Sequence, residues 1–245
     1  MTWQWFNRLT SPKSYFDITD WLLPPMLIIS VILMMVGTYL GLYDSPIDYQ
    51  QGNTVRIMYI HVPTATASMF GYVVMAIAAA VGYIWRIKMA HMAALSIAPV
   101  GAAMTFLALV TGAIWGKPTW GTWWVWDARL TTELILFFLY VGFMALHSAF
   151  EDRELGDRAA GVLAMVGVVN VPIIHYSVYW WNTLHQKSSI SVAGKASMPV
   201  EMLTPLLLMM FAIILFCTAI SMYRIRNEIL DRERDKNWIK ERLSA

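Results

Sequence analysis

The sequence holds 245 residues, of which 58% are hydrophobic and 14% are charged, with a formal net charge of +2. A soluble domain usually carries about 25% charged residues, so this composition excludes an ordinary water-soluble protein and indicates a chain surrounded by lipid. The near-neutral charge gives no reason to expect a nucleic-acid partner. The one cysteine, Cys217, excludes an internal disulfide and a Cys-x-x-Cys redox pair.

Six stretches of the chain are apolar over the roughly 20 residues that a helix needs to cross a bilayer. Pro24 and Pro25 are expected near the start of the first helix, whereas Pro99 and Pro172 lie inside their stretches and are expected to kink them. The stretches are residues 21–42, 60–85, 93–115, 131–150, 159–181 and 201–223. The sequence therefore predicts an all-α polytopic membrane protein with six transmembrane helices in a single domain, residues 1–245.

The distribution of Lys and Arg predicts the orientation of these helices. If the N-terminus is cytoplasmic, 13 of the 18 basic residues lie on the cytoplasmic side, as the positive-inside rule requires. Both termini are then cytoplasmic, and the charged tail 224–245 is expected to be a solvated helical extension of the last span. Three longer loops, residues 43–59, 116–130 and 182–200, then face the outside.

The second of these outer loops is unusually rich in tryptophan. It reads W-G-K-P-T-W-G-T-W-W-V-W-D from Trp115 to Asp127, and it holds five of the 12 tryptophans of the chain. Tryptophan favours membrane interfaces, but an interfacial belt needs only one or two per helix end. Broad aromatic faces next to glycines, which allow a close backbone approach, suit a flat aromatic ligand. The candidate binding residues here are Trp115, Gly116, Trp120, Gly121, Trp123, Trp124, Trp126 and Asp127.

Asp127 and the residues after it also have ordinary structural roles available. Asp127 lies just before the fourth span, where its carboxylate would cap the helix. Arg129 and Glu133 are four residues apart and could pair on the first turn of that helix. Capping and a direct part in shaping the loop are both open for Asp127.

Five histidines fall on different sides of the predicted membrane. His91 and His147 lie near the cytoplasmic ends of spans and are expected to be solvated or interfacial. His175 lies within the fifth span, where a neutral ring bonded to a neighbouring helix is expected, although an ionisable group inside a membrane is also a functional candidate. His61 and His185 lie on different helices at the outer face, at the depth of the tryptophan segment.

Taken together, His61 and His185 predict a haem site. Imidazole is a standard axial ligand of haem iron, so one ring on each side of a porphyrin would complete its coordination. The two outer arginines, Arg56 and Arg129, could pair with the haem propionates, because guanidinium matches carboxylate geometry. Each of these four side chains could alternatively be a plain interfacial residue.

The tryptophan motif and the two outer histidines resemble the WWD-domain family of haem-handling membrane proteins, and the length and span number resemble its CcmC branch. The resemblance covers essentially the whole chain. It implies that haem b is held transiently and non-covalently between His61 and His185 at the periplasmic face of the bacterial inner membrane. It also implies a WWD loop, residues 115–129, that contacts haem.

The same resemblance implies partners and no catalytic activity of the chain itself. Haem would pass to the periplasmic haem chaperone CcmE during cytochrome c maturation, the ABC transporter subunits CcmA and CcmB would use ATP to release the loaded chaperone, and the small membrane protein CcmD would join the complex. The main alternative is a subunit of a haem b-containing membrane oxidoreductase. A transporter of aromatic substrates and a purely structural subunit are weaker alternatives, because the predicted midplane has few polar groups and five loop tryptophans would have no purpose.

Overall fold

The computed structural model describes residues 10–185 and 198–243. Within these ranges, six helical stretches are long and apolar enough to cross a membrane, which confirms the predicted multi-pass, all-α fold. The elements are α2 (Pro12–Tyr39) with a π-helical turn (Leu40–Asp44), a 3-10 turn (Asn53–Ile57) leading into α3 (Met58–Trp85), α4 (Lys88–Trp120), α5 (Ala128–Ser148), α6 (Arg153–Gly167), α7 (Asn170–Trp180), α8 (Val200–Glu233) and α9 (Asn237–Leu243).

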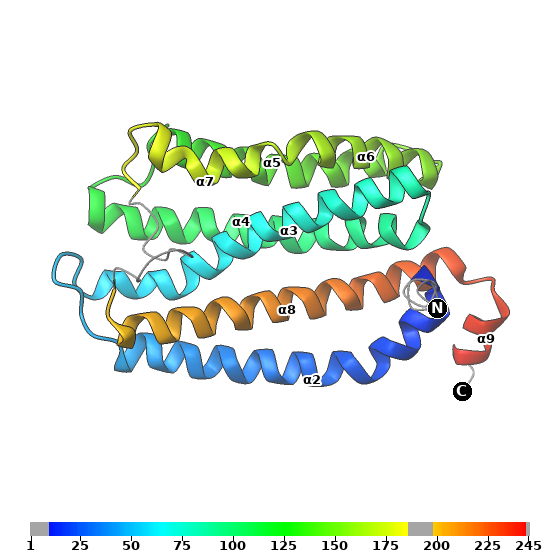
Figure 1. Cartoon of the computed structure of the whole chain (residues 1–245), viewed down its shortest axis with the longest axis horizontal. Coiled ribbons are helices and arrows are strands. Elements are labelled where there is room, and N and C mark those ends of the chain that lie inside the picture. Colours follow the sequence, from blue (N-terminus) through cyan, green and yellow to red (C-terminus); the bar gives the residue numbers. More distant parts are fainter. Residues whose placement is uncertain (1–9, 186–197, 244–245) are drawn as a thin grey trace, which may run out of the picture.

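The helices pack as three neighbouring groups (Figure 1): α2 with α8, α3 with α4, and α5 with α6 and α7. Helix α3 also contacts α6 and α8, so it lies at the centre of the bundle. The C-terminal ends of α2, α4 and α7 lie at one end of the bundle. The start of α2, the α3–α4 and α5–α6 turns, and α9 lie at the opposite end. This arrangement separates the tryptophan segment from the charged tail, as the sequence predicts.

The first helix begins earlier than the sequence predicts. The hydroxyl of Ser11 accepts a hydrogen bond from the backbone N–H of Ser14 at 3.5 Å, and Pro12 occupies the first helical position. Proline suits that position because its missing N–H would have no helical partner there. Pro24 and Pro25 therefore lie inside α2 rather than near its start, and Figure 1 shows α2 bending toward its N-terminal end.

The fifth predicted span is interrupted. Helix α6 ends at Gly167 and α7 begins at Asn170, two residues before Pro172. Proline has no N–H with which to bond the carbonyl four residues earlier, so it kinks or breaks a helix. The fifth span is thus disrupted near Pro172, as a break rather than the predicted kink, whereas α4 is continuous through Pro99.

The C-terminal tail is only partly the predicted extension. Helix α8 continues to Glu233, as expected, but α9 folds back against the first turns of α2. The Trp238 ring meets the Phe16 ring edge-on at 5.7 Å, and Arg242 Nη1 bonds Asp17 Oδ1 at 3.0 Å. The end of the tail is therefore docked on the bundle rather than freely solvated.

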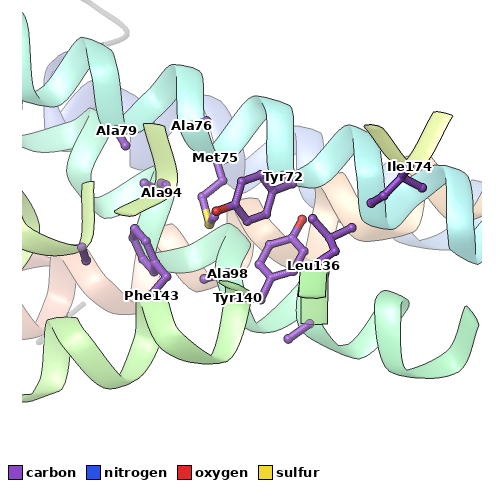
Figure 2. Packing of buried hydrophobic residues seen from close by; sticks show 13 residues of the cluster. Tyr72, Met75, Ala76, Ala79, Ala94, Ala98, Leu136, Tyr140, Phe143 and Ile174 are labelled. Carbon is purple, nitrogen blue, oxygen red and sulfur yellow. The ribbon is translucent and has the colours of Figure 1, made fainter. Parts of the chain in front are cut away.

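The core below the outer loops joins α3, α4 and α5 (Figure 2). The rings of Tyr72 and Tyr140 meet edge-on at 4.9 Å, and the Tyr140 hydroxyl donates to the Ser68 carbonyl at 2.8 Å. Gly101 on α4 is needed here, because a Cβ at this position would overlap the Tyr140 ring. Close approach of helices at small residues is the usual way to pack a membrane bundle.

At the opposite end, the structure shows two further histidines. His91 is 8% exposed and lies on α4, because the loop before it is short and α4 already begins at Lys88. Its ring packs against Gly82, where a Cβ would come within 2.8 Å. The expectation that His91 is solvated is therefore wrong, although it lies near the end of the bundle. His147 is half-buried at the end of α5 and bonds Asp157 through Nε2 at 3.1 Å.

Candidate functional site

His61 is held in a defined orientation on the first turns of α3. Its Nδ1 lies 3.0 Å from the carbonyl oxygen of Ala108 and 3.2 Å from the hydroxyl of Thr111, both on α4. A carbonyl only accepts hydrogen bonds, so Nδ1 carries the proton in this contact. In the neutral ring, Nε2 then keeps the lone pair that a metal binds, which is the usual arrangement of a metal-binding histidine and its supporting group.

The structure brings His185 to face His61. His185 lies in the segment after α7, and the centroids of the two rings are 6.3 Å apart with an interplanar angle of 38°. The two residues are separated by four helices in the sequence, so only the folded bundle joins them. Gly112 on α4 allows the His61 ring to lie close, because a Cβ there would come within 3.0 Å of its Cε1.

Two tryptophans flank this histidine pair. The Trp115 ring meets the His61 ring edge-on, with centroids 5.6 Å apart and an interplanar angle of 74°. The Trp120 ring lies 6.2 Å from that of His185. Trp115 is fixed in turn by Gln51, whose side-chain oxygen accepts from its Nε1 at 2.7 Å. Each of the two imidazole rings therefore lies next to one tryptophan ring.

The remaining tryptophans of the segment lie farther along the chain and differ in exposure. Trp123 is 57% exposed and Trp126 is 77% exposed. Trp124 is half-buried, meets Trp126 edge-on at 5.5 Å, and has a buried Nε1 with no hydrogen-bond partner in the described part of the chain. The segment thus has an inner pair of tryptophans at the histidines and an outer pair open to the surroundings.

The loop part of the tryptophan segment is shorter than the sequence predicts. Helix α4 continues through Trp120, so the connection to α5 is only residues 121–127. Gly121 ends α4 in the left-handed conformation with φ of 81°, which glycine adopts without strain. Gly116 is buried against the Trp120 ring, where a Cβ would come within 3.2 Å. The two glycines therefore have separate local roles, one in chain reversal and one in packing.

Asp127 combines the two roles that the sequence left open. Its Oδ1 accepts from the backbone N–H of Leu130 at 2.8 Å and caps α5. Its Oδ2 accepts from the backbone N–H of Leu184 at 3.2 Å. One carboxylate therefore joins the tryptophan segment to the residue that precedes His185.

Replacing Asp127 with asparagine is expected to separate these roles. The amide oxygen of asparagine still caps α5, but its NH₂ group cannot accept from the Leu184 N–H. We expect the melting temperature to change little and the affinity for a ligand at His185 to fall about 10-fold or more, as when a supporting group of a metal ligand is lost. Haem titration and thermal unfolding of the same samples measure both, and an affinity equal to that of wild type would contradict the assigned role.

The two outer arginines are anchored by backbone carbonyls. Arg56 Nη2 bonds the Ser45 carbonyl at 3.3 Å, and Arg129 Nη1 bonds the Ile174 carbonyl at 2.7 Å. Neither forms an ion pair with any residue in the described ranges, and the buried Nε of Arg56 has no hydrogen-bond partner there. Both guanidinium groups therefore keep donors for an anionic ligand.

The predicted pairing of Arg129 with Glu133 is wrong. Glu133 is buried on α5, and its Oε1 instead accepts from the Ser68 hydroxyl on α3 at 3.0 Å. The competing bond from Arg129 to the Ile174 carbonyl explains the difference, because it draws the guanidinium toward α7.

His175 lies outside the site. Its side chain is exposed on α7, and its ring meets that of the adjacent Tyr176 at 4.9 Å. No hydrogen bond joins it to a neighbouring helix within the described chain, so that expectation is wrong. Sequence reasoning also missed Gln51, Thr111 and Gly112, which hold or accommodate Trp115 and His61. Gln51 gave no signal of its own, since it lies in an ordinary polar loop.

The spacing of the two imidazoles fits one metal atom between them. With a metal–nitrogen bond of about 2 Å on each side, two imidazoles on opposite sides of one metal have ring centres roughly 6 Å apart. The observed separation is 6.3 Å. No group of three or more His, Cys, Asp or Glu side chains that could hold a metal ion occurs in the described residues. Two imidazoles are the number of axial ligands that a haem iron takes from a protein.

Comparison with known proteins shows the family of the chain. The sequence profile described as Heme exporter protein C, CcmC, matches residues 5–240. The chain belongs to the CcmC family. It is 51% identical to the Heme exporter protein C of Haemophilus influenzae over 238 residues, which cover 97% of each chain. It is 50% identical to that of Escherichia coli K12 over 239 residues, covering 98% of this chain and 96% of the relative.

CcmC relatives also occur outside bacteria. A Marchantia polymorpha protein, described as a candidate ccmC-like mitochondrial protein of cytochrome c biosynthesis, is 44% identical over 188 residues, covering 77% of this chain and 79% of the relative. The family resemblance predicted from the tryptophan motif is thus confirmed over nearly the whole chain.

Proposed function

We propose that this CcmC family member binds haem b non-covalently between His61 and His185 at the periplasmic face of the inner membrane and delivers it to the haem chaperone CcmE during cytochrome c maturation. The facing imidazoles, 6.3 Å apart, carry the proposal. The bond from His61 Nδ1 to Ala108 supports it, because it leaves Nε2 for iron. The names of the bacterial relatives, which refer to haem export, point the same way.

The surrounding residues suit the parts of a haem molecule. Trp115 and Trp120 lie beside the two histidines and offer aromatic faces to the porphyrin. Arg56 and Arg129 retain donors for the propionates, which guanidinium groups bind well. Asp127 would keep the WWD loop, residues 115–129, attached to the His185 segment. The haem would be cargo rather than a permanent cofactor.

The exposed tryptophans support delivery to a partner. Trp123 and Trp126 are the most exposed rings of the segment, and exposed aromatic residues are typical contact residues of protein interfaces. We assign them to CcmE rather than to haem. A site at one end of the bundle also suits handover, whereas a haem buried in mid-membrane would suit electron transfer.

The orientation and the remaining partners complete the proposal. The basic residues concentrate at the end of the bundle opposite the histidines, which supports our assignment of that end, with the tail 224–245, to the cytoplasm. The sequence has no G-x-x-x-x-G-K-[ST] motif for ATP, so an energy-dependent step belongs to partners. We assign that step to CcmA and CcmB, with CcmD as a further membrane partner, and we assign no catalysis to this chain.

A transfer assay tests the proposal. The full chain, purified with haem in detergent, is mixed with the soluble domain of CcmE, which captures haem covalently through a histidine. We expect CcmE to acquire covalently bound haem, measured by haem staining after denaturing electrophoresis, as the chain loses its Soret absorbance. If the haem stays with the chain and is instead reduced by a quinol, the oxidoreductase alternative replaces the proposed function.

A further inference from the structure

A cleft with excess positive charge lies at the end of the bundle opposite the paired histidines. Its volume is about 530 Å³, and it is bounded by the ends of α3, α4, α6 and α8. Seven Lys and Arg residues line it, against five Asp and Glu residues. The basic residues are Arg86, Lys88, Arg153, Arg158, Arg232, Arg234 and Lys236.

Three of the acidic residues are already neutralised within the cleft. The three ion pairs are Asp157 with Arg232 at 2.6 Å, Asp231 with Arg153 at 2.7 Å, and Glu154 with Arg158 at 2.6 Å. The other two carboxylates keep their charge: Glu233, which accepts a hydrogen bond from Trp238 Nε1 at 3.0 Å, and Asp235. The ion pairs therefore offset three of the five negative charges of the lining.

The other four basic residues keep their charge available. Arg86, Lys88, Arg234 and Lys236 form no ion pair with any residue that the structure describes. Arg86 and Lys88 come from the α3–α4 turn, whereas Arg234 and Lys236 follow α8. Two separate parts of the chain therefore bring four cations to a cleft in which two carboxylates, Glu233 and Asp235, are also unpaired with a cation, so the lining keeps a net excess of two positive charges.

The start of α4 adds to this positive potential. Helix α4 begins at Lys88, no side chain caps its first N–H groups, and its first turn has no acidic residue. The N-terminus of a helix carries partial positive charge and free N–H donors, which bind phosphate oxygens. The buried ring of His91, one turn later, forms part of the cleft wall.

The backbone at Arg86 fixes where this side chain leaves the fold. Arg86 has φ of 56°, and it is the one non-glycine residue with positive φ in the described ranges. It is the C-cap of α3, where a left-handed residue commonly ends a helix and glycine is the usual one. Glycine at this position would therefore keep the turn between α3 and α4.

We propose that this cleft binds a phosphate group at the membrane surface, namely the headgroup of an anionic phospholipid. The cleft lies among helix ends, at the level where headgroups meet a spanning bundle. Basic pockets between transmembrane helices on the cytoplasmic side bind lipids such as cardiolipin. The site is separate from the histidine pair and does not depend on the proposed haem function.

The test is lipid binding to the full chain in detergent, measured by native mass spectrometry. The probes are cardiolipin, phosphatidylglycerol and phosphatidylethanolamine, with inorganic phosphate as a soluble competitor. The first variant is Arg86→Gly combined with Lys88→Gln, because glycine suits the left-handed turn and the fold is kept. The second is Arg234→Gln with Lys236→Gln. The control, Lys13→Gln with Arg224→Gln, removes two exposed cations from the same end of the bundle but outside the cleft.

Each cleft variant is expected to weaken cardiolipin binding roughly 10- to 30-fold, since each cation near an anionic headgroup contributes about fivefold. The control variant is expected to bind as wild type does. Cardiolipin binding that is equal in wild type and both cleft variants, or equally reduced in the control, would overturn the proposal. If inorganic phosphate displaces cardiolipin and itself requires Arg86 and Lys88, the phosphate site stands and its ligand is a soluble phosphate compound.

Discussion

Replacing His61 or His185 with alanine is expected to weaken haem binding by roughly 100-fold or more, because even a group that only supports a metal ligand contributes about 10- to 100-fold. The centroids of the two rings are 6.3 Å apart, so each variant would remove one side of the proposed iron coordination. Haem titration of the purified full chain, followed at the Soret band, measures the affinity. The remaining histidine should leave an altered spectrum rather than an attenuated copy of the wild-type one.

His175→Ala is the matched control for these variants. His175 lies on the same half of the bundle, and its exposed ring contacts only the adjacent Tyr176 among the ring contacts of the described chain. Its loss should leave the haem affinity within about twofold of wild type, as expected for a surface substitution away from the site. Equal loss of haem in His175→Ala and His61→Ala would show that the effect is not specific to the facing pair.

Replacing Asp157 with alanine is expected to lower the free energy of unfolding by about 3–5 kcal/mol, the usual effect of removing one partner of a buried ion pair. The Asp157 side chain is 5% exposed and accepts from Arg232 through both oxygens, at 2.6 and 2.9 Å. It also binds His147 Nε2 at 3.1 Å. Its loss removes the bidentate bond that joins α6 to α8 and leaves Arg232 with an ion pair only on its own helix, to Glu228.

Glu154→Ala is the comparison for Asp157→Ala. Glu154 also pairs with an arginine, Arg158, but their side chains are 69% and 45% exposed. Such a pair is expected to contribute less than about 1 kcal/mol, because water screens it. Reversible unfolding of each variant in mixed micelles with increasing SDS measures the difference. Similar destabilisation by both substitutions would contradict the assignment of Asp157 as the principal bridge between α6 and α8.

The number of spans was predictable from the sequence, and so was the location of the candidate site residues at one end of the bundle. Both follow from the apolar runs of the chain. Runs of apolar residues define helices that must cross lipid, and an even number of crossings returns the chain to the same end. Those two facts alone bring His61, the segment 115–127 and His185 to a common end. The match between the tryptophan motif and the CcmC family follows from the same residues.

Helix boundaries were less predictable, because polar residues continue a helix beyond its apolar part. Helix α2 begins at Pro12 and α4 ends at Trp120, several residues outside the apolar stretches. The hydropathy pattern does not show that Ser11 caps the start of α2 or that the chain reverses direction at Gly121. As a result, the first third of the expected tryptophan loop, residues 116–120 of 116–130, is the final part of α4.

Individual side-chain contacts were the least predictable, because they depend on which helices become neighbours. Local spacing favoured a pair of Arg129 with Glu133, but α7 presents the Ile174 carbonyl to Arg129 and α3 presents the Ser68 hydroxyl to Glu133. His91 is buried because Gly82 on α3 leaves room for its ring. Neither neighbour can be inferred from the sequence around the residue concerned.

The central claim is that His61 and His185 bind one haem iron from opposite sides. Electron paramagnetic resonance of the full chain loaded with ferric haem tests it most directly. We expect a low-spin signal typical of two imidazole ligands in wild type, and its replacement by a high-spin signal in His61→Ala and in His185→Ala. A high-spin signal in wild type, or a low-spin signal that survives both substitutions, would contradict the claim.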